Sequence, residues 1–101
     1  MLKNYFDGGS LSDEIFYVDG VKQEVAKFYY PSGYLKEEIP YIDGEINGKY
    51  ITYYENGVVK STADYIDDKL VGMLKEYYPD GHLKEEMVIK NGKKKGLFVT
   101  Y

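Results

Sequence analysis

The sequence predicts an all-β fold: a single-layer antiparallel β-meander of tandem 24-residue β-hairpins that forms an elongated, twisted sheet. The first observation is a repeat, because Tyr-Tyr-Pro-Ser-Gly-Tyr-Leu-Lys-Glu-Glu at 29–38 returns as Tyr-Tyr-Pro-Asp-Gly-His-Leu-Lys-Glu-Glu at 77–86, with a related segment at 53–62. The second is that Gly or Pro interrupts every period twice. The third is that the segments between these breaks are short and rich in Tyr, Val and Ile, which favours strands over helices.

The repeat places the whole chain, residues 1–101, in one domain. Fixed-period similarity indicates that each copy is one structural unit that packs on its neighbours. The first copy is degenerate, and Tyr101 begins what would be a fifth. The copies cover approximately residues 5–28, 29–52, 53–76 and 77–101.

Each copy reads as two strands and two turns. The first turn, as in Pro31-Ser32-Gly33, combines a Pro that fixes φ with a Gly that supplies the positive φ of a three-residue loop followed by a bulge. The second turn, as in Asp43-Gly44, has two residues, and such pairs between extended segments indicate a tight hairpin. Equivalent second turns are Asp19-Gly20, Asp67-Asp68 and Asn91-Gly92.

A further Gly column lies at 48, 72 and 96, and Glu24 holds it in the first copy. We expect a bulge or bend at this column as the next strand begins. The pattern predicts eight or nine strands in a sheet about 40 Å across, with equivalent residues of neighbouring repeats about 10 Å apart.

The paired tyrosines are the candidate binding residues. Neighbouring strand residues point to opposite faces, so each pair predicts one ring on each face of the sheet. The rings are either the core of the repeat or a partly exposed aromatic strip that binds a partner, since Tyr combines apolar area with a hydroxyl. One column is Tyr29, Tyr53 and Tyr77, and the other is Tyr30, Tyr54 and Tyr78.

Composition excludes several classes of site. The chain has 17 acidic and 13 basic residues, a net charge of −4, one His and no Cys. Disulfides and thiolate metal sites are therefore excluded, and the acidic balance argues against nucleic acid. The first residues lack the apolar segment of a signal peptide, so the sequence favours the cytoplasm. A signal or lipoprotein anchor already removed would leave the same sequence.

The sequence predicts no catalytic residue, no metal ligand and no cofactor. His82 stands alone and reads as a surface strand residue. The Glu37-Glu38 and Glu85-Glu86 pairs split between the two faces, so we expect solvated charges that pair with lysines across strands. These lysines are Lys36, Lys60 and Lys84.

One basic cluster lies at the last turn, and it favours protection of the sheet edge over a lipid-headgroup site because earlier turns do not repeat it. It comprises Lys90, Lys93, Lys94 and Lys95.

The unit Tyr-Tyr-x-x-Gly-x-Leu/Val-Lys, then Tyr-x-Asp-Gly, then Gly-x-x-x-x-Tyr-Tyr closely resembles MORN repeats over residues 5–101, in the variant of bacterial YwqK-like proteins. The resemblance implies stacked antiparallel hairpins, a scaffolding or protein-binding role, some contact with phospholipids, and, from the antitoxin label of those proteins, a toxin partner. Asp68 and Glu24 depart from the Gly pattern, which favours irregular packing toward the N-terminus.

Three classes of function are compared. The first is a non-catalytic module that binds a protein, either a toxin or a second copy through the open sheet edge or the aromatic face. The alternative is a module that binds phospholipid or cell-surface carbohydrate, and the absence of Trp argues against the carbohydrate. An enzyme is the third class, and no recurring set of nucleophile, base and oxyanion donor supports it.

Overall fold

The computed structural model describes the backbone of residues 2–90 and 93–100 and the side chains of residues 2–88. The predicted turn at Asn91-Gly92, and the placement of the lysine side chains around it, lie outside the described residues.

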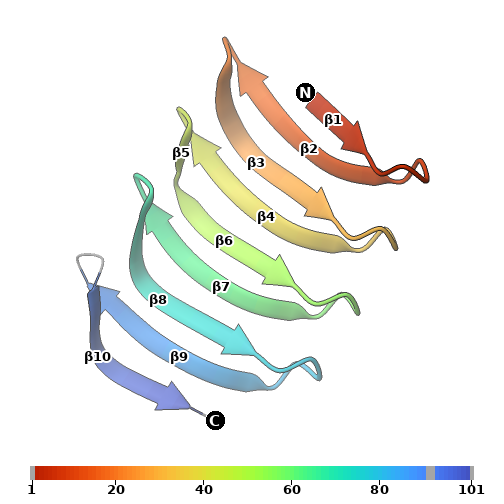
Figure 1. The fold of residues 1–101 in the computed structure, drawn as a ribbon. Coiled ribbons are helices and arrows are strands. Elements are labelled where there is room, and N and C mark those ends of the chain that lie inside the picture. The colour runs from red at the N-terminus through yellow and green to blue at the C-terminus, as the bar shows by residue number, and fades with distance from the viewer. Residues whose placement is uncertain (1, 91–92, 101) are drawn as a thin grey trace.

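The described residues form one open antiparallel sheet whose strands follow one another in chain order (Figure 1), which confirms the all-β meander. The short β5 lies beside β4, off this path. There are ten strands instead of eight or nine, because Asn47 interrupts one strand and both pieces pair with β4. They are β1 (Leu2–Tyr5), β2 (Leu11–Val18), β3 (Val21–Tyr29), β4 (Leu35–Ile42), β5 (Glu45–Ile46), β6 (Gly48–Tyr53), β7 (Val59–Ile66), β8 (Lys69–Tyr77), β9 (Leu83–Lys90) and β10 (Lys93–Thr100).

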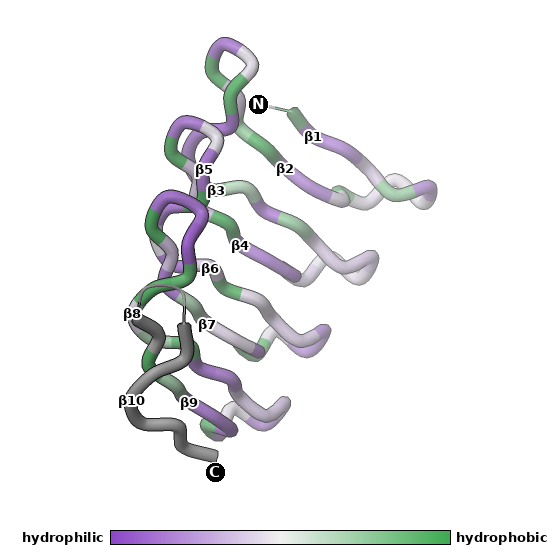
Figure 2. The backbone as a smooth tube through the Cα atoms, turned by 60° about the vertical axis from the view of Figure 1, so that its left-hand side comes forward, coloured by the Kyte–Doolittle hydropathy of each residue, from purple (hydrophilic) through white to green (hydrophobic). Residues whose placement is uncertain are grey.

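The sheet measures 43 × 34 × 14 Å, so its thickness is that of one layer and its length agrees with the predicted 40 Å. Each hairpin bends along its length, and the turns of successive repeats line up at the two ends of the strands (Figures 1 and 2). The two types of turn therefore form two separate borders of the sheet.

The three-residue turns are as predicted. Gly33 has a φ of 99°, and its N–H donates to the carbonyl of Tyr30 over 2.9 Å. Tyr29 lies opposite Leu35, but Phe28 lies opposite Glu37, so one extra residue bulges out of the second strand. The same shift follows the turns of the next two repeats.

The two-residue turns are hydrogen-bonded from repeat to repeat. Asp43 and Gly44 both have positive φ, 50° and 83°, as a type I′ turn requires, and the Gly44 N–H donates to the carbonyl of Lys22 over 2.9 Å. Asp68 replaces Gly here at a φ of 67°. Its N–H donates to the carbonyl of Ile46, and its carboxylate accepts the Ile46 N–H over 2.7 Å. These two bonds explain why an aspartate is tolerated at this turn.

The predicted bulge column also has left-handed backbone. Glu24, Gly48 and Gly72 have φ of 61°, 121° and 72°, and pairing shifts register beside residues 24 and 72. A Cβ at Gly48 would lie 3.1 Å from the Cγ of Pro40, so the column also needs Gly for space. In the first repeat, Glu24 adopts the same left-handed backbone, so the bulge forms there although glutamate is less favourable than glycine at this position.

Among the described side chains, the buried hydrophobic ones that form the core are Ala26, Ile39, Ala63 and Met87, with exposed fractions of 1 to 8%. Ala26 lies opposite Ile39 and Tyr50 opposite Ala63, so a small residue faces a large one in both pairs. We call the face that carries these residues the core face and the opposite one the outer face. A core this small indicates that the fold depends on strand pairing and cross-strand contacts as much as on burial.

Candidate functional site

The first tyrosine column lies on the outer face, where its hydroxyls bind carboxylates of the preceding repeat. The Tyr29 hydroxyl donates to Glu14 over 2.6 Å, and that of Tyr53 donates to Glu38. Burial, followed by the hydrogen-bonded carboxylate, raises the pKa of each phenol to about 12. The predicted acids therefore act as acceptors that fix the tyrosines.

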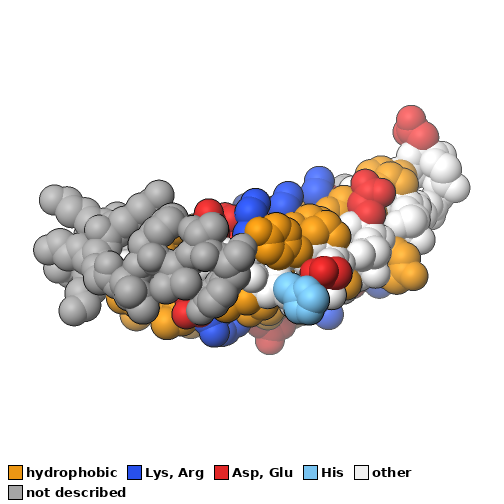
Figure 3. All heavy atoms as spheres, turned by 90° about the horizontal axis from the view of Figure 1, so that it is seen from below, with side chains coloured by type: hydrophobic (Ala, Val, Ile, Leu, Met, Phe, Trp, Pro, Cys, Tyr) orange, Lys and Arg blue, Asp and Glu red, His pale blue; other side chains and the backbone are white. Residues whose placement is uncertain are grey.

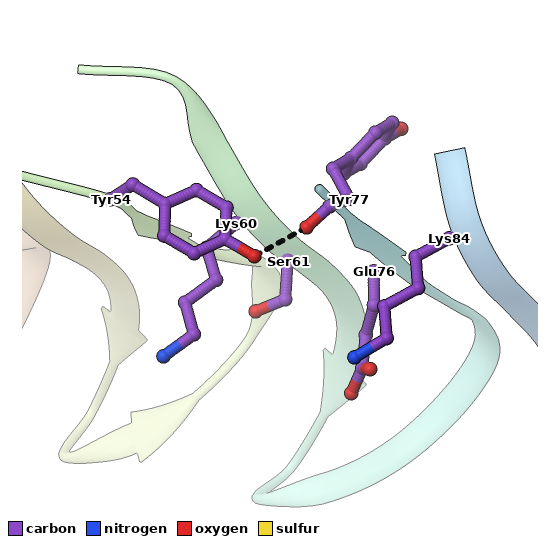
Figure 4. Close-up of a pocket in the computed structure, with 6 residues that line it drawn as sticks. All are labelled: Tyr54, Lys60, Ser61, Glu76, Tyr77 and Lys84. Atoms are coloured by element: carbon purple, nitrogen blue, oxygen red, sulfur yellow. Dashed lines mark hydrogen bonds between the residues drawn. The ribbon is translucent and has the colours of Figure 1, made fainter. Parts of the chain in front are cut away.

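The second column lies on the core face and ties each repeat to the next. The Tyr30 hydroxyl donates to the carbonyl of Tyr53 over 2.7 Å, and that of Tyr54 to the carbonyl of Tyr77 over 2.6 Å. Figure 4 shows the Tyr54 ring beside that carbonyl while the Tyr77 ring points away from it. The members of a pair thus separate onto opposite faces.

The lysines that follow the three-residue turns pack on these rings. The Nζ atom of Lys36 lies 5.8 Å from the centre of the Tyr30 ring, and Lys60 and Lys84 repeat the contact on Tyr54 and Tyr78 at 5.8 and 5.9 Å. A row of Lys side chains is visible along one surface in Figure 3.

The predicted pairing of these lysines with glutamates is wrong. Among the described side chains, the ion pair is Lys49–Asp64 at 3.9 Å, and the His82 ring lies 3.0 Å from Asp80. The physical reason is the bulge: Lys36 is its extra residue, so its side chain turns to the ring of Tyr30.

The third repeat lacks one contact of the outer column. Thr62 stands where Glu14 and Glu38 stand in earlier repeats, and its hydroxyl cannot extend as far as a glutamate carboxylate. No hydrogen bond of the Tyr77 hydroxyl occurs among the described residues, although Tyr29 and Tyr53 each have one. Tyr77 is therefore the member of this column whose hydroxyl is not fixed by a carboxylate.

A hollow of about 130 Å³ lies on the core face between the third and fourth repeats (Figure 4). Its Ser61 hydroxyl bonds to that of Thr52 at 2.5 Å, and among the residues that line the hollow Glu76 is the carboxylate and there is no His. The described side chains include no cluster of His or acidic residues suited to a metal ion. The hollow is lined by Tyr54, Lys60, Ser61, Glu76, Tyr77 and Lys84.

His82 is exposed, as predicted, but it lies in the turn before β9 and not in a strand. Its N–H donates to the carboxylate of Asp80 over 3.0 Å, and its ring Nδ1 lies 3.0 Å from the other oxygen. This contact closes the turn, and the backbone N–H lowers the pKa of Asp80.

The sequence interpretation missed an apolar strip at the border of two-residue turns. Val18, Ile42 and Ile66 each precede such a turn on the outer face and are 48, 57 and 58% exposed, and Val21 lies opposite Val18 at 39%. The signal was present, because an aliphatic residue precedes the turn in three successive repeats. We call these four residues the apolar strip.

The fold and its two faces define a tandem β-hairpin repeat protein in which paired tyrosines hold one repeat to the next. The family model of the MORN repeat variant matches residues 25–43, 46–67 and 70–91, which is more than half of the chain. The chain therefore belongs to the MORN repeat family, whose members are generally protein- or membrane-interaction modules. Neither the curated proteins nor the solved structures contain a match.

The part of the chain that the structure describes contains no helix with the length and apolar character needed to cross a membrane.

Proposed function

We propose that the chain is a non-catalytic MORN-type module for protein–protein interaction. The observation that carries the proposal is the single layer: only four of the described side chains classed as hydrophobic are buried, while large apolar side chains such as Ile42 and Ile66 stay more than half exposed. Contiguous exposed apolar surface on a soluble fold is typical of a binding face. The repeat supplies the same chemistry at regular intervals, which suits an extended partner.

The proposal includes a cytoplasmic location and, in its most specific form, an antitoxin-like role. The resemblance to YwqK-like proteins supports a toxin as the partner. Self-association through the sheet edge or the aromatic face is the other form, and light scattering after size-exclusion chromatography tests it. A monomer at high concentration would exclude self-association.

The main proposal is tested by measuring how this chain binds one candidate protein at a time. Proteins encoded next to this chain are purified, and their binding to the full chain is measured by isothermal titration calorimetry. Saturable binding with a stoichiometry near one supports the proposal. Liposome flotation with neutral and anionic vesicles is run in parallel, because the lysine row over the Tyr30, Tyr54 and Tyr78 rings favours phospholipid as the alternative ligand. Flotation without any protein binding would overturn the main proposal.

A further inference from the structure

We infer that the apolar strip with its acidic border docks a basic amphipathic helix of a partner protein; this deepens the proposed function and rests on it. Val18, Ile42 and Ile66 occupy equivalent positions in three repeats, so their side chains form a row about 10 Å apart along the sheet. Residues seven apart on an α-helix are also about 10.5 Å apart and share a face. One apolar side chain of the helix can therefore meet the strip in each repeat.

Charge selects a basic partner. Val18, Ile42 and Ile66 are each followed by an exposed aspartate, so the border of two-residue turns carries one or two carboxylates in each of the first three repeats. Figure 2 shows hydrophilic backbone at these turns beside hydrophobic backbone. These carboxylates belong to Asp19, Asp43, Asp67 and Asp68.

Two lysines lie near the strip and bear on the net charge of this border. The Nζ of Lys22 lies 5.1 Å from the centre of the Tyr41 ring, on the core face. Lys69 lies opposite Ile66 and is exposed, so it is the cation that adjoins the strip among the described side chains. Lys90 holds the strip column in the fourth repeat, which limits the strip to three repeats.

The same charge argues against two other occupants. A second copy docked strip to strip would bring acidic borders together, and like charges at an interface oppose association. Anionic lipid headgroups would meet the same repulsion. A cationic helix instead gains both apolar burial and charge complementarity.

The test uses a fluorescent synthetic helix with Leu on one face and Lys on the other, and a matched peptide in which each Lys is Glu. Fluorescence anisotropy with the full chain is expected to show binding of the Lys peptide that weakens as salt increases. The double variant Ile42→Ser/Ile66→Ser is expected to bind about tenfold more weakly or worse, because two half-exposed anchors are lost. Asp19→Asn/Asp67→Asn is expected to reduce both the affinity and its salt dependence.

Tyr34→Ser is the matched control, because Tyr34 is an equally exposed apolar residue, 55%, at the opposite border of the sheet. The Tyr34→Ser variant should bind the Lys peptide as the wild type does. Ile42→Lys/Ile66→Lys gives a second strip variant, and circular dichroism confirms the fold of each. If the strip variants bind the Lys peptide as tightly as the wild type does, the inference is overturned. It is also overturned if the wild type binds the Lys and Glu peptides equally. The inference is overturned as well if the wild type forms a dimer, or binds anionic vesicles, and the strip variants abolish that association. If a protein partner binds the strip variants normally, this inference fails and the proposed function stands.

Discussion

At the scale of single residues, the tyrosines are structural connectors before they are binding residues. Tyr29 and Tyr53 anchor to carboxylates, while Tyr30 and Tyr54 anchor to backbone carbonyls of the following repeat. The phenol must be protonated to donate these bonds. Ionisation of the phenols thus reports directly on the contacts between repeats.

The first prediction concerns high pH. Tyr29, Tyr50 and Tyr53 have pKa values raised to about 12, above the ordinary value near 10. Their contribution to stability is therefore complete below about pH 10 and is lost as the pH rises through about 12. Near-UV absorbance should show part of the tyrosinate signal appearing only as the protein unfolds in this range.

The Glu38→Gln variant tests whether one of these raised pKa values belongs to Tyr53. Removal of the carboxylate charge is expected to lower the pKa of Tyr53 toward its ordinary value, although burial, the larger cause, remains. The Glu45→Gln variant, at an exposed position of β5, serves as the matched control. Identical tyrosinate titrations for wild type and Glu38→Gln would contradict the assignment.

The second prediction fills the gap in the outer column. Thr62→Glu is expected to supply a carboxylate to Tyr77 and to raise the free energy of unfolding by about 1 kcal/mol, the usual contribution of such a bond. Urea denaturation measures the change. In a Tyr77→Phe background the gain should largely disappear. A gain of the same size there would mean that the new glutamate acts through Lys75, its cross-strand neighbour.

At the scale of the elements, the turns were predictable and the contacts between strands were not. Asp43-Gly44 and Pro31-Ser32-Gly33 specify their conformations through the φ preferences of their own residues. The position of Lys36 depends on which strand residue is the extra one of a bulge, and this depends on pairing with another strand. The carboxylates that Tyr29 and Tyr53 bind lie 15 residues away in sequence, so only the register of the two paired strands brings them together.

The third prediction tests the bulge column. Glu24→Gly is expected to stabilise the fold by about 1 kcal/mol, because Glu24 has a φ of 61° that glycine adopts without a steric penalty. Thermal and urea unfolding measure the effect.

Gly48→Ala is the opposing variant. It should destabilise by more than about 1 kcal/mol, since strain at a φ of 121° adds to the 3.1 Å approach of Pro40. Loss of stability in Glu24→Gly would show that the glutamate side chain stabilises the bulge.

At the scale of the whole molecule, each described strand pairs only with the strands beside it in the sheet, so stability is largely a sum of local terms. The fourth prediction is a gradient of amide exchange. Strand β1 pairs on one side only, whereas β7 is paired on both sides. Hydrogen exchange should therefore be faster in β1 than in β7. Uniform protection of both strands would indicate one fully cooperative unit.

The order of the strands has a mechanical consequence. The two ends of the described chain lie at opposite ends of the sheet, and the strands run across the line that joins them (Figure 1). A force applied to the two ends would load the hydrogen bonds of one strand pair at a time, as in a zipper, instead of shearing a whole row together. The module should therefore extend at low force in steps of one hairpin, and a partner bound across several repeats would act as a clasp against that extension.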